Sequence, residues 1–352
     1  MTDKNNSEFE NHLNNFTETQ WLETISRLLP EIHEVDQNAV QIWFRFYPLS
    51  LFRYLQKAED KDAALHGFAM QGNYELKNQI DTSHNFLWGH RFWSAVKKAI
   101  TERSSSFDAG QLDLANEIRT IGRAAAKETG QDSSLLLGIT AVGLMTLVQT
   151  GLDAFNTANG DTQKVSGLLA KSPEAVLAGR RKEKKGGILG FLRTIDKEFQ
   201  VTWDETQKGS KFDVILNEEL ASGAARDQSQ NWLERDERCG EGVIPVECRS
   251  AACGTCWVGV VAGAEHLSDV ARLERKQMKV FGYKQGDEAK PIMRLACQAQ
   301  AEGSVSIVLP PWNGVFGKKI YGVERVELEP ATSSAKKLRE TIDEALTLTE
   351  EN

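Results

Sequence analysis

Residues that commonly bind metals or cofactors are scarce in this sequence, which has five cysteines and six histidines among 352 residues. It has no glycine-rich dinucleotide fingerprint, no flavin motif and no P-loop, which argues against a self-contained reductase. The first ten residues are polar and acidic and do not form a secretory signal, so we expect a cytoplasmic protein without disulfides. An excess of basic residues is also missing, and the net charge of −8 argues against nucleic-acid binding.

The composition is that of a folded protein, with 40% hydrophobic and 26% charged residues. A chain of 352 residues is expected to form two domains. The charge is unevenly divided, because residues 1–200 carry a net charge of −2 and residues 201–352 carry −6. This acidity suits docking of the second half to a basic patch on a reductase or acceptor protein, or it serves solubility alone.

Four of the five cysteines form a pattern that predicts metal chemistry. Cys248, Cys253 and Cys256 are spaced C-x4-C-x2-C, and Cys297 follows far downstream. This is the spacing of plant-type [2Fe–2S] sites, in which a distant fourth cysteine completes the ligand set. Two irons bridged by two sulfides need four thiolates, of which one tight loop can supply three. The sequence therefore predicts a [2Fe–2S] cluster.

The residues between these cysteines are mostly small, which favours the same interpretation. We expect them to support the loop; they are Arg249, Ser250, Ala251, Ala252, Gly254 and Thr255. Small residues let the backbone wrap closely and point N–H groups at the bridging sulfides, which tunes the reduction potential. Gly254 can adopt backbone angles that residues with a Cβ resist. A bulky residue at Ala252 or Gly254 is expected to damage the site.

Three other uses of these cysteines fit the sequence less well. Zinc ribbons bring two short Cys-x2–4-Cys knuckles, whereas this chain has one knuckle and one isolated partner. A Rieske centre needs two histidines near paired cysteines, and His266 stands alone ten residues past Cys256. A disulfide is not expected without a secretory signal. Cys239, nine residues before the first ligand, is interpreted as a free, partly buried thiol, or alternatively as a redox-sensitive residue or substitute ligand.

The neighbouring residues extend the pattern. The segments 254–260, 294–298 and 303–310 resemble the ligand-to-strand passage, the last ligand and the final strand of plant-type or adrenodoxin-like [2Fe–2S] ferredoxins. The resemblance covers residues 198–311 and implies a β-grasp fold and one-electron transfer to a protein redox partner. It also implies the cluster ligands, which are Cys248, Cys253, Cys256 and Cys297.

The first 195 residues resemble no family and read as helices. Apolar residues recur at helical spacing in 8–60, with breaks at Pro30 and Pro48, and a long helical pattern covers 71–102. Residues 133–152 contain no charge, so they form a helix buried within a bundle or, less favoured, a membrane span. Ser172 and Pro173 predict a helix start.

The segment 71–102 also holds the only candidates for a second cofactor site. Asp81 and His84 have the spacing of half a di-iron motif, but no Glu-x-x-His on another helix completes it. On a helix, His84 and His90 would lie 240° apart around the axis, on different faces. Hydrogen-bonded histidines in an aromatic core are the better interpretation, with haem or a non-haem metal as the alternative.

The sequence thus predicts an α+β protein with an all-α domain at 1–195, a β-grasp [2Fe–2S] domain at 198–315 and a tail at 316–352. The expected tail helix has an apolar stripe: Leu338, Ile342, Ala345 and Leu346. The basic run 180–187 reads as a linker, or as a dock for a partner or membrane surface. The predicted function is a one-electron carrier whose helical domain docks or anchors it to its redox partner. The alternatives are an iron–sulfur subunit of a multicomponent oxidoreductase, whose helical domain binds substrate or a second cofactor, and a structural module.

Overall fold

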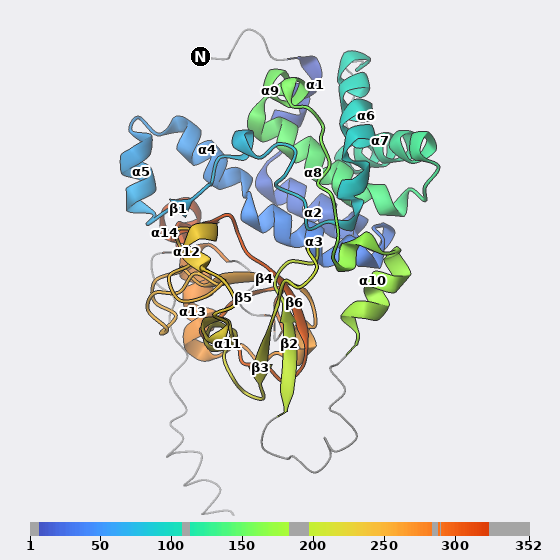
Figure 1. Cartoon of the computed structure of the whole chain (residues 1–352). Coiled ribbons are helices and arrows are strands. Elements are labelled where there is room, and N and C mark those ends of the chain that lie inside the picture. The colour runs from blue at the N-terminus through green and yellow to red at the C-terminus, as the bar shows by residue number, and fades with distance from the viewer. Residues whose placement is uncertain (1–6, 108–112, 183–196, 284–287, 289, 324–352) are drawn as a thin grey trace, which may run out of the picture.

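The computed structural model describes residues 7–107, 113–182, 197–283, 288 and 290–323. A helical layer formed by the first part of the chain lies above a five-stranded sheet formed by the second part (Figure 1). This order confirms the predicted α+β class. The expected tail helix and most of the basic run 180–187 lie outside the described residues.

The helical layer begins with five helices that follow one another closely. They are α1 (Glu8–Asn14), α2 (Glu18–Leu28), α3 (Glu34–Phe46), α4 (Leu49–Lys57) and α5 (Lys61–Gly67). Thr17 caps α2 in a reciprocal capping box with Gln20. The two predicted breaks are present, because Pro30 lies in a 3₁₀ turn before α3 and Pro48 immediately precedes α4.

Five more helices complete the described part of this layer. They are α6 (Trp93–Ser105), α7 (Leu114–Thr129), α8 (Ser134–Thr150), α9 (Leu152–Thr157) and α10 (Pro173–Arg180). Ser172 caps α10 through the backbone N–H of Ala175, with Pro173 in the first turn as predicted.

Helix α8 is the uncharged stretch of the sequence, and it lies at the centre of the bundle. Every residue from Leu135 to Gln149 is buried, and the helix packs against α3, α6 and α7. In the part of the chain that the structure describes, no helix combines the length and the apolar character that crossing a membrane requires. The interpretation of this stretch as a buried bundle helix is therefore confirmed.

The prediction of one long helix over 71–102 is wrong. The chain forms the short strand β1 (Gln71–Gly72), the 3₁₀ turns η2 (Leu76–Asn78) and η3 (Trp88–Phe92), and only then α6. The buried carboxylate of Asp36 explains part of the difference, because it accepts the backbone N–H groups of Trp88 at 2.6 Å and Gly89 at 2.8 Å. These N–H groups bind a side chain from α3 instead of a helical carbonyl, a tertiary contact that local periodicity does not reveal.

The sheet has the strand order β3-β2-β6-β4-β5. Its strands are β2 (Glu198–Thr202), β3 (Lys211–Ile215), β4 (Trp257–Ala262), β5 (Met293–Leu295) and β6 (Val305–Val308). β2 and β6 are parallel, and the other neighbours are antiparallel. This mixed sheet agrees with the β-grasp fold that the resemblance implies.

Three helices accompany the sheet. They are α11 (Leu220–Arg226), α12 (Trp232–Arg235) and α13 (Arg272–Phe281), and residues 264–266 form a separate 3₁₀ turn before α13.

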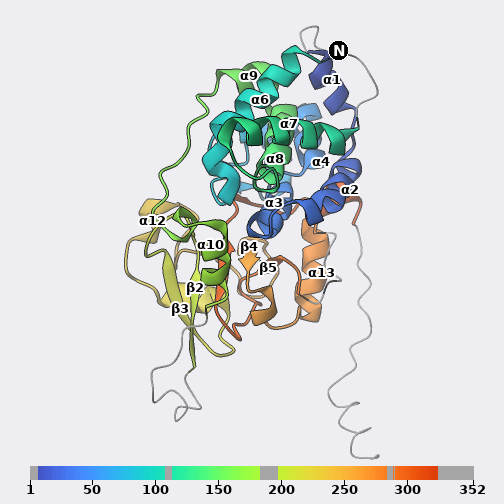
Figure 2. The ribbon, with the colours of Figure 1, turned by 90° about the vertical axis from the view of Figure 1, so that its right-hand side faces the viewer.

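The helical layer and the sheet share one continuous apolar core. Helix α3 lies between the other helices and the strands (Figure 2) and packs on β4. The contact is close, because a Cβ at Gly259 would lie 2.5 Å from Cγ2 of Ile42. The Asn38 amide adds a hydrogen bond to the carbonyl of Val261 at 3.0 Å.

A second connection joins the two regions near the end of the described chain. Strand β7 (Trp312–Asn313) pairs with β1 of the helical layer, and the Trp312 indole donates to the carbonyl of Phe46 at 2.7 Å. Helix α14 (Gly317–Tyr321) then packs against α4 and α13. The segment after the sheet is thus held by both regions.

Candidate metal centre

The three clustered cysteines lie on an irregular loop that leads into β4. Three of its residues have left-handed backbone angles, with φ of 50° at Arg249, 61° at Ala251 and 74° at Gly254. These angles turn the chain tightly within six residues. A Cβ at Gly254 would also lie 3.1 Å from Cγ2 of Val315, so this position needs glycine for both conformation and space.

The small residues of the loop differ in burial. Gly254 is enclosed, whereas Ala252 is exposed. The second tight position is Ala251, which is 1% exposed and has a left-handed backbone. Alternating small residues look alike in the sequence, and only the path of the loop decides which of them point inward.

Backbone N–H groups of the loop point at sulfur, as its small residues predict. The N–H groups of Ser250 and Ala252 lie 3.4 Å and 3.3 Å from Sγ of Cys248. The hydroxyl of Thr255 lies 3.0 Å from Sγ of Cys253. Such donors stabilise negative charge on a thiolate, so the loop favours the ionised form that binds metals.

The four thiols interact as two pairs, Cys248 with Cys253 and Cys256 with Cys297. Burial raises the pKa of Cys248, but hydrogen bonds from Ser250 and Cys253 outweigh burial and bring this pKa down to about 7. A hydrogen bond from the Cys256 thiol lowers the pKa of Cys297 to about 6. Each pair therefore contains one thiol that ionises readily.

The paired arrangement suits a binuclear cluster, in which each iron takes two thiolates. Two thiol pairs match two irons with two thiolates each, and the donor set therefore fits a [2Fe–2S] cluster.

The two pairs differ in their access to solvent. Cys256 and Cys297 are 2% and 6% exposed, whereas Cys248 and Cys253 are half-buried. Three residues between the latter two are open to solvent: Arg249, Ser250 and Ala252. The candidate centre thus has one pair inside the protein and one pair at its surface.

Residues 222–302 match the family described as the 2Fe-2S iron-sulfur cluster binding domain. The chain contains a ferredoxin-type [2Fe–2S] domain. The match includes all four cysteines of the predicted ligand set and does not extend into the helical layer. No solved structure matches the chain.

A buried ion pair positions the fourth cysteine of the ferredoxin-type domain. Glu274 of α13 and Arg294 of β5 are both fully buried, and their two side chains are joined by two hydrogen bonds of 2.9 Å. Glu274 also accepts the backbone N–H of Leu295, and the N–H of Ala296 donates to the carbonyl of Cys256 at 2.8 Å. Sequence reasoning missed Glu274, although it is a lone acid among basic residues on α13.

A second residue that sequence reasoning missed supports the loop from outside the matched region. Asn313 of β7 is 1% exposed, and its amide donates to the carbonyl of Thr255, next to Cys256. Since β7 pairs with β1, the helical layer helps to hold the cysteine loop.

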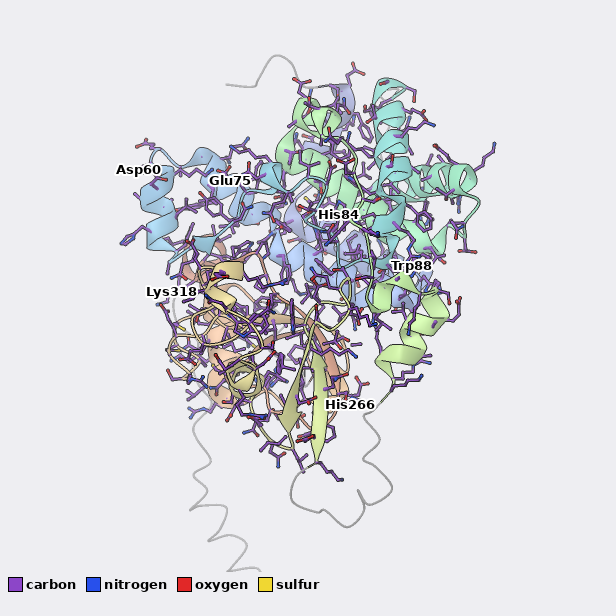
Figure 3. The ribbon with its side chains drawn as sticks, in the orientation of Figure 1. Asp60, Glu75, His84, Trp88, His266 and Lys318 are labelled. Carbon is purple, nitrogen blue, oxygen red and sulfur yellow. The ribbon has the colours of Figure 1, made fainter. Side chains whose placement is uncertain are left out.

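The second candidate site lies in the helical layer, where Figure 3 shows His84. The prediction that His84 and His90 lie apart is wrong, because their segment is not a helix and their Nδ1 atoms are 2.9 Å apart. Their other ring nitrogens also have partners. His84 Nε2 is 3.2 Å from the carbonyl of Ile80, and His90 Nε2 accepts the N–H of Gln163 at 3.0 Å.

Asp81 is also engaged by the protein. Its carboxylate accepts the indole N–H of Trp93 at 2.7 Å and the backbone N–H of Gly160 at 3.0 Å. Burial lowers the pKa of His84 well below its usual value and that of His90 to about 4, so both rings are neutral at pH 7. These contacts favour the interpretation as a hydrogen-bonded core.

The remaining cysteine is a free, buried thiol. Cys239 is 2% exposed and its Sγ donates to the carbonyl of Val243 at 3.2 Å. Burial raises its pKa to about 11, which keeps it protonated and a poor ligand. His266, which the Rieske alternative would need, lies in the sheet region (Figure 3) with Nδ1 2.9 Å from the carbonyl of Ser304.

Proposed function

We propose that the four paired cysteines ligate the [2Fe–2S] cluster and that the protein carries single electrons between protein partners. The ligands are Cys248, Cys253, Cys256 and Cys297. The observations that support this most strongly are the backbone N–H groups that point at Sγ of Cys248 and the family match that includes all four cysteines. When bound, a [2Fe–2S] cluster takes up and releases one electron.

The burial of the four cysteines determines where electrons enter and leave the protein. Electrons enter and leave at the half-buried pair, Cys248 and Cys253, because the other pair faces the interior. Arg249 at this edge is ion-paired with Glu241. Residues 201–352 carry a net charge of −6, of which −4 belongs to residues 324–352, and this acidity suits a basic docking surface on the partner.

The helical layer acts as the anchor for this carrier. Its α3 covers β4, and β1 pairs with the segment that supports the cysteine loop. These contacts hold the ferredoxin-type domain in one orientation on the helical layer. The half-buried cysteines, Cys248 and Cys253, remain accessible to the partner. We infer that the helical surface makes the lasting contact with the redox partner.

The test is reconstitution of the full chain with iron and sulfide under anaerobic conditions. We expect two irons per chain, a red-brown colour and a paramagnetic signal after reduction by one electron. Cys253→Ala should lose this signal, whereas the matched control Cys239→Ala should keep it. A colourless or zinc-only protein, or a normal cluster in Cys253→Ala, would overturn the proposal.

A further inference from the structure

A cavity of about 250 Å³ lies where the helical layer meets the ferredoxin-type domain. Helices α2 and α3 supply apolar walls, including Leu22 and Phe44, and Phe316 supplies another from the far side. This volume is just below the range of about 300–1,000 Å³ usual for ligand pockets. It suits a single-ring molecule and is too small for a dinucleotide or a haem.

Tyr283 lines this cavity and has an unsatisfied hydroxyl. The residue is 9% exposed, and its hydroxyl oxygen is buried with no hydrogen-bond partner among the residues that the structure describes. Burial holds the pKa of Tyr283 well above its usual value, with the charge of Arg45 acting in the opposite direction. The hydroxyl is therefore protonated and available as a donor, and buried donors of this kind are rare in native proteins.

Arg45 of α3 adds further donors to the same cavity. Within the described part of the chain, Arg45 makes one hydrogen bond, from Nη1 to the carbonyl of Gln41 at 2.7 Å, although a guanidinium has five N–H groups. No carboxylate within the described ranges lies at ion-pair distance from it, although the charge of Glu288 acts on it from further away.

Glu18, the carboxylate that lines the cavity, is already engaged. Its two oxygens accept the N–H of Ser50 at 2.7 Å and the hydroxyl of Tyr321 at 2.6 Å. The cavity therefore offers apolar walls and a surplus of donors at Arg45 and Tyr283, which is the complement of a carboxylate on an apolar body.

The cavity is connected to the cysteine loop by aromatic contacts. The ring of Tyr283 packs on that of Trp257, with centroids 4.7 Å apart, and Trp257 directly follows Cys256. The ring of Phe281 lies 5.4 Å from that of Trp257 and borders Gly254. A molecule held against Tyr283 would therefore lie one ring away from the residue next to a proposed cluster ligand.

We propose that this cavity binds a small aromatic carboxylate. Its carboxylate is held by the guanidinium of Arg45 and the hydroxyl of Tyr283, and its ring packs against Leu22, Phe44 and Phe316. Its presence is transmitted to Trp257 through the packed Tyr283 ring. The binding itself does not depend on the proposed electron transfer, but any effect on the cluster does. Such a site would make the protein a ligand-binding iron–sulfur subunit and not a carrier alone.

The test is calorimetric titration of the reconstituted full chain with benzoate, and with benzamide as the neutral molecule of the same shape. We expect benzoate to bind about tenfold or more tightly than benzamide, because charge-assisted hydrogen bonds are the stronger ones. Tyr283→Phe removes one hydroxyl and should weaken benzoate roughly three- to tenfold. The control Tyr54→Phe, on a 38% exposed tyrosine that does not line the cavity, should leave binding unchanged.

Three further variants test the assignment. Arg45→Met should abolish the preference for benzoate, and Arg45→Lys should restore part of it because the charge returns without the planar fork. Benzoate should change the protein's fluorescence, and Trp257→Phe should remove this change while calorimetric binding persists. No benzoate binding, equal binding of benzamide, or binding unchanged in Tyr283→Phe would overturn the inference. The visible spectrum of the cluster, recorded on the same samples, separates such a result from failure of the proposed function.

Discussion

The four thiols of the ferredoxin-type domain and the Asp81–His84–His90 group of the helical layer are both clusters of potential metal ligands. They differ in what satisfies them. In the helical layer, both ring nitrogens of His84 and of His90 and both carboxylate oxygens of Asp81 have hydrogen-bond partners within the protein. In the ferredoxin-type domain the thiols interact with one another, and N–H groups point at their sulfur. Residue type alone does not distinguish a structural group from a metal site. The hydrogen-bond partners of the candidate ligand atoms do distinguish them.

The largest expected effect comes from removing one member of each cluster. Cys297→Ala should lose the iron and sulfide of the reconstituted protein, because one iron would be left with a single thiolate. His84→Phe should keep two irons per chain, since the histidine is proposed to be structural. Iron and sulfide analysis of both variants checks this. Iron lost in His84→Phe with the fold intact would place a metal at the histidines.

The next effect concerns the buried ion pair behind Cys297. Glu274→Ala leaves the Arg294 guanidinium buried without its partner, which should cost about 3–5 kcal/mol in the free energy of unfolding. Urea denaturation measures this loss. The exposed pair of Arg181 and Glu34 in the helical layer provides the matched control, because Glu34→Ala should cost less than about 1 kcal/mol. Equal costs would show that the Glu274 pair does not brace the site.

An intermediate effect should follow acidification of the helical layer. The folded pKa of His90 is lowered to about 4, below the unfolded value of about 6.5, so its contribution is complete above pH 6.5 and falls as the pH drops towards 4. Between pH 7 and pH 5 this amounts to about 2 kcal/mol of lost stability. Asp36 has the opposite effect on stability over this pH range. Burial raises its folded pKa to about 6, so acidification from pH 7 to pH 5 favours the folded state at this residue.

The difference between wild type and His90→Gln isolates the histidine from the other titrating groups. Urea denaturation at pH 7 and pH 5 should show a smaller loss for His90→Gln than for wild type. An equal loss of stability between pH 7 and pH 5 in the two proteins would mean that the histidine pair is not held neutral in the folded state.

The smallest effect distinguishes two small residues of the cysteine loop. Gly254→Ala places a Cβ on a backbone with φ of 74° and against Val315, which should cost about 1–2 kcal/mol. Ala252→Val adds bulk at an exposed position and should change stability by less than about 0.5 kcal/mol. Thermal unfolding and iron content of the two variants check the difference. Equal damage by both would restore the expectation that the whole loop is sterically closed.

Features that depend on nearby residues were predictable from the sequence. The cap at Ser172 and the buried helix over 134–150 are present within a few residues of their expected positions. The cysteine spacing predicted the cofactor class, because three thiols within nine residues constrain the chemistry without reference to the rest of the chain.

Features that depend on distant residues were not predictable. Asp36 accepts the backbone N–H of Trp88 from 52 positions away, and Arg294 meets Glu274 across 20. The same holds for the contact between His84 and His90 and for the cavity at Arg45 and Tyr283, because each forms only when separate elements pack. The sequence by itself determined the class of cofactor and the local elements of this protein. The tertiary structure decided which polar groups are satisfied, since that depends on partners brought together by the shared core.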